Sequence, residues 1–343
     1  MGNRNTNLQR AKNAKNDEFF TTYEDIEREM SHYVRHFVGK TVYCNCDDPR
    51  RSNFCRYFLR NFNVLGLKRL ICTSISETTA VGDGLFDLRT DHEPLPWGQG
   101  RILDVQTIGT GREDLSDDFI DAWLNETPCI QSLTGDGDFR SRECRSYLRA
   151  ADIVVTNPPF SLFRELVVML VRRRKKFLLV GNQNALTYKE IFPLIQKNKV
   201  WTGYQFGEMK FRVPADSEMR ETRSWVDADG QKWRSLGNAM WLTNLDIPRR
   251  HERLPITRRF TPEEYPRYDS YDAVNVRRIT DIPKDYAGVM GVPITIINRY
   301  NAEQLEIVGE ANHGSDNEFD LFKPTINGRL LFKRILVKNR KPE

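Results

Sequence analysis

Four consecutive residues, Asn157-Pro158-Pro159-Phe160, combine the groups that suit the binding of a flat amine. The two prolines stiffen the turn and remove backbone N–H groups that would compete for its carbonyls. If the Asn157 side-chain oxygen and the Pro158 carbonyl accept hydrogen bonds from an aromatic NH2 group, its delocalised lone pair can turn toward an electrophilic methyl group. Phe160 would stack on the ring and hold it in line. These four residues are therefore candidate catalytic residues, and the alternative is an ordinary proline-rich turn.

The elements around this turn place it where ligands commonly bind. Residues 151–156 are apolar and mostly β-branched, which predicts a buried strand, and residues 161–171 have apolar side chains at helical spacing. The turn therefore lies at the carboxyl end of a strand, just before a helix. Open α/β sheets form their ligand crevices at this edge.

The segment resembles the [DNS]-P-P-[FYW] signature of amino-group methyltransferases that use S-adenosyl-L-methionine (AdoMet). The wider chain resembles the EcoRI-type adenine-specific (N6) DNA methyltransferase family over most of residues 10–245. That resemblance implies an α/β fold: a Rossmann-like AdoMet-dependent methyltransferase sheet with an antiparallel terminal hairpin, plus a C-terminal recognition region. The motifs that carry it are Lys12–Phe20, Val42–Pro49, Gly135–Phe139, Asn157–Phe160, Lys176–Asn184 and Tyr188–Phe192.

The resemblance also implies that a segment near the N-terminus lines the AdoMet pocket. Phe19, Phe20, Thr21 and Thr22 are similar to a "QFFTP" segment that covers the methionine end of the cofactor in related adenine methyltransferases. The alternative is a helix entrance, with Thr21 or Thr22 as N-cap and both phenylalanines in the core. One segment can serve both purposes. The helix that follows is predicted over Tyr23–Val38.

A pair of carboxylates follows the first predicted strand, Thr41–Cys46. The family holds AdoMet at this place, usually through a glycine-rich turn, and the Gly-x-Gly pattern is missing here. Asp47 and Asp48 could instead meet the ammonium group of the cofactor. Asp48 and Pro49 are also a good helix start, as N-cap and first helical residue.

A second acidic position, Asp138, precedes Phe139 and lies between a strand-like run at Cys129–Leu133 and a predicted helix at Arg140–Arg149. By resemblance, Asp138 would accept a hydrogen bond from the adenine of AdoMet and Phe139 would cover its ring. The alternative is a Gly-Asp turn that caps the next helix, a role better suited to Asp136.

Further elements complete the predicted sheet. We expect strands at Lys68–Thr73, Arg101–Val105, Phe177–Val180, Val200–Tyr204 and Gly237–Asn244, a helix at Tyr188–Gln196, and a hairpin turn at Asp229-Gly230. Residues 77–111 are rich in Gly, Pro and Asp and are predicted to be an insertion of unassigned purpose.

Composition limits the class of protein. The 343 residues are 39% hydrophobic and 29% charged, which is typical of a globular chain, and no apolar run or signal peptide suggests a membrane. Six cysteines without a paired framework predict reduced thiols in a cytoplasmic protein. Cys44 and Cys46 lack further residues at metal-ligand spacing, so we expect buried strand cysteines and no metal.

The domain prediction follows from shifts in charge. Residues 1–16 are basic and Asn-rich and predict a mobile arm, residues 17–245 form the catalytic domain, and residues 246–343 form a target-recognition region. The last region interleaves Arg, Pro and Tyr, and the net charge of +5 suits a polyanion. The alternatives are a basic subdomain that only packs on the sheet, and recognition through core loops such as 205–235.

The sequence therefore predicts a site-specific adenine-N6 methyltransferase that uses AdoMet and acts on double-stranded DNA, flipping its target adenine out of the helix. A restriction–modification role is expected, with a possible cognate endonuclease that acts on the same site without stable binding. The alternatives are an enzyme that methylates RNA adenine or protein glutamine, and a catalytically decayed DNA-binding protein.

Overall fold

The computed structural model describes residues 19–75, 98–109, 115–126, 128–215, 217–312, 314 and 317–343. The predicted N-terminal arm and most of the 77–111 insertion lie outside these residues. The chain divides into two compact units. The first lies within residues 1–182 and 205–245, and the second within residues 183–204 and 246–343. In the part of the chain described, no helix has the length and apolar character needed to cross a membrane.

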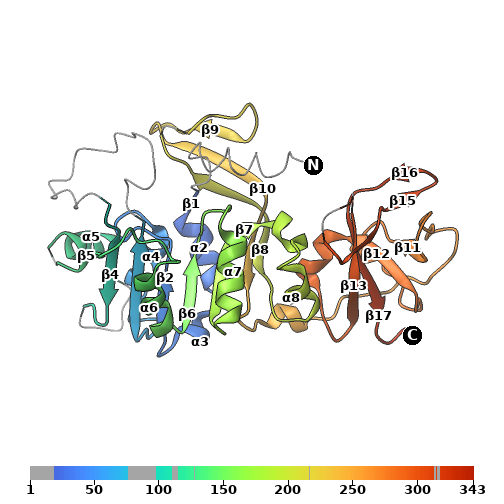
Figure 1. Cartoon of the computed structure of the whole chain (residues 1–343), viewed down its shortest axis with the longest axis horizontal. Coiled ribbons are helices and arrows are strands. Elements are labelled where there is room, and N and C mark those ends of the chain that lie inside the picture. The colour runs from blue at the N-terminus through green and yellow to red at the C-terminus, as the bar shows by residue number, and fades with distance from the viewer. Residues whose placement is uncertain are drawn as a thin grey trace. The chain divides into compact units, whose positions relative to one another are not determined.

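A large mixed sheet organises the first unit (Figure 1). Its central strands β3, β2, β6 and β7 are parallel, and the antiparallel strands β4 and β10 flank them. In spatial order the strands are β1 (Phe20–Thr21), β8 (Trp201–Arg212), β10 (Lys232–Thr243), β7 (Lys176–Asn182), β6 (Ile153–Thr156), β2 (Thr41–Cys44), β3 (Arg69–Ser74), β4 (Arg101–Val105) and β5 (Ile130–Ser132). The α/β class and the antiparallel last strand are confirmed.

The helices of this unit fix where the sheet opens. Helix α4 (Asn53–Arg60) connects β2 to β3, whereas α7 (Phe163–Arg172) connects β6 to β7 in the opposite direction along the sheet. Because such crossovers are right-handed, the two helices cover opposite faces. Helix α6 (Arg142–Ala150) leads into β6 and packs near β2. The direction of the connections therefore reverses between β2 and β6, which is the switch point of the sheet.

Two predicted helices begin or end elsewhere. The helix expected over Tyr23–Val38 is interrupted: α2 spans Tyr23–Met30 and α3 spans Val34–Phe37. Between them the Ser31 hydroxyl donates to the Arg28 carbonyl at 2.8 Å, a local bond that competes with helix continuation.

The expected N-cap at Asp48 is also wrong, because the cap of α4 is Ser52, whose hydroxyl accepts from the Phe54 N–H at 3.0 Å. Asp48 instead accepts from the Arg50 N–H at 2.9 Å in a tight turn before the helix.

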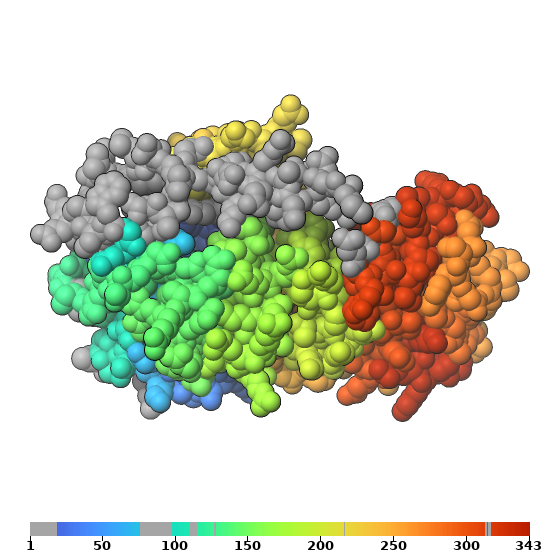
Figure 2. Space-filling model, in the orientation of Figure 1, coloured from blue at the N-terminus to red at the C-terminus, as the bar shows by residue number. Residues whose placement is uncertain are grey.

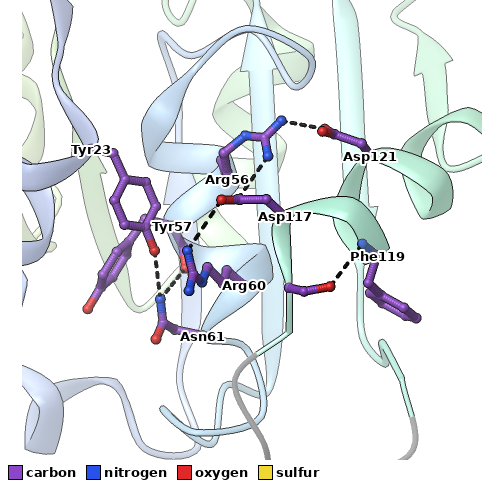
Figure 3. Close-up of polar contacts among 9 residues, drawn as sticks. Tyr23, Arg56, Tyr57, Arg60, Asn61, Asp117, Phe119 and Asp121 are labelled. Carbon is purple, nitrogen blue, oxygen red and sulfur yellow. Dashed lines mark hydrogen bonds and ion pairs between the residues drawn. The ribbon is translucent and has the colours of Figure 1, made fainter.

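Charged side chains join α4 to α5 (Asp117–Glu126) on the outside of the unit (Figure 3). Arg56 lies between Asp117, at 2.9 Å, and Asp121, while Arg60 reaches Asp117 at 3.4 Å. Asn61, the C-cap of α4, donates to the Tyr57 carbonyl at 2.9 Å. These bonds fix the helix that follows Asp47 and Asp48 in the chain.

Strand β10 is longer than its neighbour β7 and builds a projecting arm. It pairs with β7 only from Ala239 to Thr243, and Ala239 lies opposite the last residue of β7. We call residues 208–212 of β8, β9 (Ser224–Val226) and residues 232–238 of β10 the arm. Figure 1 shows it standing clear of the sheet beyond the end of β7, and Figure 2 shows its tip, in yellow, at the outer surface.

The predicted hairpin turn at Asp229-Gly230 is confirmed, since β9 pairs with β10 and Gly230 has a φ of +78°. Trp225 and Trp233 lie opposite each other across the hairpin and stack, with ring centroids 6.1 Å apart. Lys210 and Arg212 lie over these two rings, at 5.9 and 5.6 Å. The outer face of the arm is therefore both aromatic and basic.

The second unit has its own sheet, ordered β11 (Ala273–Asn275), β12 (Val289–Pro293), β17 (Arg334–Asn339), β13 (Leu305–Ala311) and β14 (Asp320–Phe322). A hairpin of β15 (Thr325–Ile326) and β16 (Arg329–Leu330) accompanies it. The helix predicted over Tyr188–Gln196 is only α8 (Phe192–Gln196), which packs on β13. Gln196 donates to the Ile307 carbonyl at 3.2 Å, and the rings of Phe192 and Phe319 pack together with centroids 5.6 Å apart. The unit is thus built from two separate stretches of chain.

The remaining short helices are 3-10 turns: η1 (Gln183–Thr187), η2 (Pro248–His251), η3 (Ile279–Asp281) and η4 (Ile294–Arg299).

Candidate functional site

Asn157 follows β6 at the switch point, and the protein determines the orientation of its amide. The side-chain nitrogen donates to the Phe19 carbonyl and to the Thr21 hydroxyl, the latter at 3.1 Å. A backbone carbonyl can only accept, so the nitrogen must face this way. The Oδ1 atom therefore faces away from Phe19, and it accepts no hydrogen bond from the described residues. This leaves an amide oxygen that a ligand's N–H can use.

Two segments that are 138 residues apart meet at this turn. The Phe160 ring stacks on the Phe19 ring, with centroids 5.2 Å apart and planes inclined by 24°. Phe19 also meets Phe211 of β8 edge-on at 5.4 Å. The structure thus brings together the candidate catalytic residues and the first of the residues predicted to line a cofactor pocket.

The neighbours of Phe19 have different positions. Thr21 is buried and pairs with Phe211 through β1, and its carbonyl accepts from Asn53 at 2.8 Å. Thr22 is the N-cap of α2 and accepts from the Asp25 N–H at 3.2 Å, as one of the two interpretations expected. Phe20 is 37% exposed, so the expectation that both phenylalanines lie in the core is wrong for this residue. The segment is therefore both a helix entrance and a wall beside Asn157.

Asp47 is buried at the end of β2 and links it to the end of β6. Its carboxylate accepts from the Ser52 hydroxyl at 2.7 Å and from the hydroxyl of Thr156, the residue before Asn157. Burial, followed by the nearby Cys44 thiol, raises the pKa of Asp47 well above its ordinary value. Asp47 therefore fixes the strand end from which Asn157 projects.

Asp48 lies closer to the surface and forms an ion pair with Arg101 at 3.0 Å. Ser74, the last residue of β3, donates to the same carboxylate at 3.2 Å. The two predicted carboxylates are thus adjacent in sequence but differ in environment. The role of each toward a cofactor remains a prediction.

The Asp138-Phe139 pair lies on the same edge of the sheet, against the end of β3. Gly137 has a φ of +83°, and a Cβ atom there would lie 2.0 Å from the Ser74 carbonyl oxygen. The Asp138 carboxylate is gripped by Arg140, with Nε at 2.9 Å and Nη2 at 2.5 Å. Phe139 is buried, and its ring is 5.6 Å from the Arg140 guanidinium carbon. A ligand at Asp138 would share this carboxylate with Arg140.

Two contributors to the site were not predicted from sequence. Thr156 reads only as the end of an apolar strand, yet it binds Asp47. Arg234 lies on the arm between Trp233 and Ser235, and its guanidinium carbon is 5.8 Å from the centre of the Phe19 ring. A charge inside a run of alternating strand residues could have suggested an inward-facing cation, but nothing in the sequence indicates its partner.

The cysteines are consistent with the expectation of thiols. All six are free, and Cys44 is buried within β2 while Cys46 follows the strand. Across the described ranges, no group of His, Cys, Asp and Glu residues has the arrangement needed to hold a metal ion.

Fold and site together define an α/β protein whose switch point presents an oriented amide beside stacked aromatic rings. The family described as "Adenine-specific methyltransferase EcoRI" matches residues 7–340. The chain belongs to this family of adenine-specific methyltransferases, which confirms the resemblance seen in its motifs.

Named relatives span almost the same length. The chain is 43% identical to Type II methyltransferase M.EcoRI of Escherichia coli, over 97% of this chain and 96% of the relative. It is 35% identical to M.MgeORF184P of Mycoplasma genitalium and to M.MpnI of Mycoplasma pneumoniae, in each case over 87% of this chain and 84% of the relative. A comparison with solved structures found no match.

Proposed function

We propose that this enzyme is a site-specific DNA methyltransferase of the restriction–modification type, which transfers a methyl group from AdoMet to adenine N6 in double-stranded DNA. The orientation of the Asn157 amide is the observation on which the proposal depends. Family membership supports adenine as the target and argues against the protein-glutamine alternative.

The chemistry follows from the atoms at the turn. Asn157 Oδ1 and the Pro158 carbonyl accept hydrogen bonds from the N6 amine, while Phe160 stacks on the ring. Hydrogen bonding of this kind favours a tetrahedral nitrogen, which is closer to the transition state than to the planar ground state. When the N6 lone pair bonds to the methyl carbon, the carbon–sulfur bond breaks, and the surplus N6 proton leaves to solvent. AdoMet supplies a methyl group activated by its positively charged sulfur.

The edge that would hold AdoMet has suitable groups. Asp138, Phe139 and the segment from Phe19 to Thr22 lie at or beside the carboxyl ends of the parallel strands. Asp48 lies at the end of β2 with part of its carboxylate exposed, where it can face a cationic ammonium. Asp47 is engaged by two hydroxyls, so it is better suited to support this wall than to contact the cofactor. The sheet order supports a Rossmann-like methyltransferase core.

The DNA substrate requires a base to leave the helix, because the N6 amine is hidden in the duplex. We propose that the flipped adenine reaches Asn157, and that residues 246–343 together with the arm contact the surrounding DNA. Exposed cations such as Arg277 and Arg278 in the second unit can neutralise phosphates. A cognate endonuclease would act on the same site without stable binding, in the cytoplasm.

The direct test is transfer of a labelled methyl group from AdoMet to unmodified duplex DNA, followed by single-molecule sequencing to identify the base and its context. Label on N6-methyladenine at one sequence supports the proposal. Label that is released by ribonuclease, or AdoMet binding without transfer to any nucleic acid, would replace it with one of the alternatives.

Variants of Asn157 test the observation itself. We expect Asn157→Ala to lower kcat by at least about 100-fold, because the acceptor for the amine is lost. Asn157→Asp keeps an acceptor but sets a carboxylate against the Phe19 carbonyl, so it should also lose most activity. Asn125→Ala, at an exposed position of α5, is the matched control and should retain activity. Full activity of Asn157→Asp would contradict the proposed role of the Phe19 contact.

A further inference from the structure

Arg234 is a buried cation beside the proposed adenine site. It is 2% exposed, and its guanidinium lies over the Phe19 ring, which in turn stacks on Phe160. Its position on the inner face of the arm brings this charge to the edge of the sheet that carries Asn157. Burial of an arginine at such a place is rare unless its charge is paired.

The protein only partly satisfies this guanidinium. Nη2 donates to the Glu218 carbonyl at 2.8 Å, whereas Nε is buried without a hydrogen-bond partner. No carboxylate of the described residues forms an ion pair with Arg234. Burial, and then the neighbouring charge of Arg220, lower the pKa of Arg234, and the charge of Glu218 offsets this only in part. The surroundings therefore disfavour the charge that they enclose.

Stability alone does not explain such a residue. An unpaired buried charge is destabilising, and replacing buried ionic groups by well-packed apolar side chains is often neutral or stabilising. The ring of Phe19 returns part of that cost through a cation–π contact. An anion that enters with the substrate would supply the missing partner, and a guanidinium can bind a carboxylate or a phosphate with two parallel hydrogen bonds.

We propose that Arg234 binds an anionic oxygen group of the reacting complex and so positions the ligand at Asn157. The inference rests on the proposed function. Two sources share this chemistry: the phosphodiester next to the flipped adenosine, and the carboxylate of AdoMet. Either would place its negative charge against the Phe19–Phe160 stack.

The test compares full-length wild-type enzyme with Arg234→Met and Arg234→Lys. Arg149→Gln, at an exposed position on the last turn of α6, is the control for a lost positive charge. AdoMet affinity is measured by calorimetry without DNA. Duplex affinity is measured across salt concentrations with S-adenosylhomocysteine present, using the sequence found by methylation mapping. A second duplex carries neutral methylphosphonates on both sides of the target adenosine.

Each outcome has a distinct meaning. A phosphate contact predicts that Arg234→Met lowers the salt slope by about 0.9, and that methylphosphonate weakens binding by wild type but not by this variant. A carboxylate contact predicts a loss of AdoMet affinity of about thirtyfold or more, with the slope unchanged. In both cases Arg234→Lys should recover part of the loss, and the thermal midpoint of Arg234→Met should equal or exceed that of wild type.

Unchanged affinities for both ligands, with or without a lower thermal midpoint in the Met and Lys variants, would overturn the inference and leave Arg234 a structural residue. The failure of the proposed function is separate, because it would appear as absent methyl transfer in the wild-type enzyme.

Discussion

At the scale of single residues, the site depends on groups that need not touch a substrate. Asp47 holds the Thr156 hydroxyl and Ser52 at once, so it joins the strand that carries Asn157 to the cap of α4. The Phe19 carbonyl fixes the amide from the other side. Asn157 is therefore oriented by two segments that both come from the N-terminal part of the first unit, one at Phe19 and one at Asp47.

Asp47 should make the stability of the protein depend on pH. Its folded pKa is raised, so its contribution is fully present below the unfolded value near 3.8 and is lost as pH rises through the folded pKa. Asp47→Asn cannot ionise and should remove this loss. We expect the unfolding free energy of the variant, relative to that of wild type, to increase as pH rises from about 4 to 7.

Chemical denaturation at several pH values measures this difference. A difference between Asp47→Asn and wild type that stays constant from pH 4 to 7 would show that Asp47 titrates normally in the fold.

The residue types of the site could be predicted from sequence, but their partners could not. Asn157 and Phe160 were identified because an amide, two prolines and an aromatic ring in sequence suit one chemistry. Asp48 is predicted to be an N-cap because Asp-Pro favours a helix start, but the N-cap of α4 is Ser52, four residues later. Which residue caps α4 depends on where the helix first packs against the sheet, and local sequence preference does not determine that position.

At the scale of elements, the absence of a Cβ atom at Gly137 lets the loop that carries Asp138 lie close to the sheet. Gly137 and Gly230 both have positive φ angles, but only Gly137 approaches another backbone, the Ser74 carbonyl. We expect Gly137→Ala to lower the unfolding free energy by about 2–5 kcal/mol, from strain and overlap together. Gly230→Ala should cost only about 1–2 kcal/mol, from strain alone.

Urea denaturation of both variants measures the two costs. Equal losses would mean that the 135–139 loop can move away from β3, and would weaken the placement of Asp138 and Phe139 at the crevice edge.

The sequence predicts the presence of a strand more readily than the residue at which the strand ends. Runs such as Phe177–Val180 are apolar because both faces of a central strand are covered, so the core of β7 was found. The β8 part of the arm could not be predicted, because residues 205–212 alternate less clearly with Gly207 among them, and the sequence predicts that β8 ends at Tyr204. The pairing of β8 with β1 explains why it continues.

At the scale of the whole molecule, the second unit includes residues 183–204 as well as 246–343. A fragment of residues 1–245 contains the N-terminal segment 1–16 and the predicted catalytic domain. It would keep α8 but lose β13, on which α8 packs. Phe192 and Ile195 are buried in the full chain. We therefore expect this fragment to bind a hydrophobic dye and to elute as aggregates in size-exclusion chromatography.

Replacing Phe192 and Ile195 by serine in the fragment should improve its solubility, and this double variant serves as the internal control. A monomeric 1–245 fragment with a cooperative thermal transition would show that residues 183–204 find other cover, and that the catalytic boundary predicted at 245 is sufficient for folding.

The two-part construction of the second unit also bears on how this family could exchange parts. Genes that trade a contiguous terminal segment can acquire a new binding module by a single recombination event. Here a transplanted 246–343 segment would meet an α8 that fits the former β13, because Gln196 and Phe192 contact residues of the old module. A successful transplant must bring residues 183–204 with it, and that stretch begins directly after β7. Inheritance of the second unit is therefore tied to the sheet that holds Asn157.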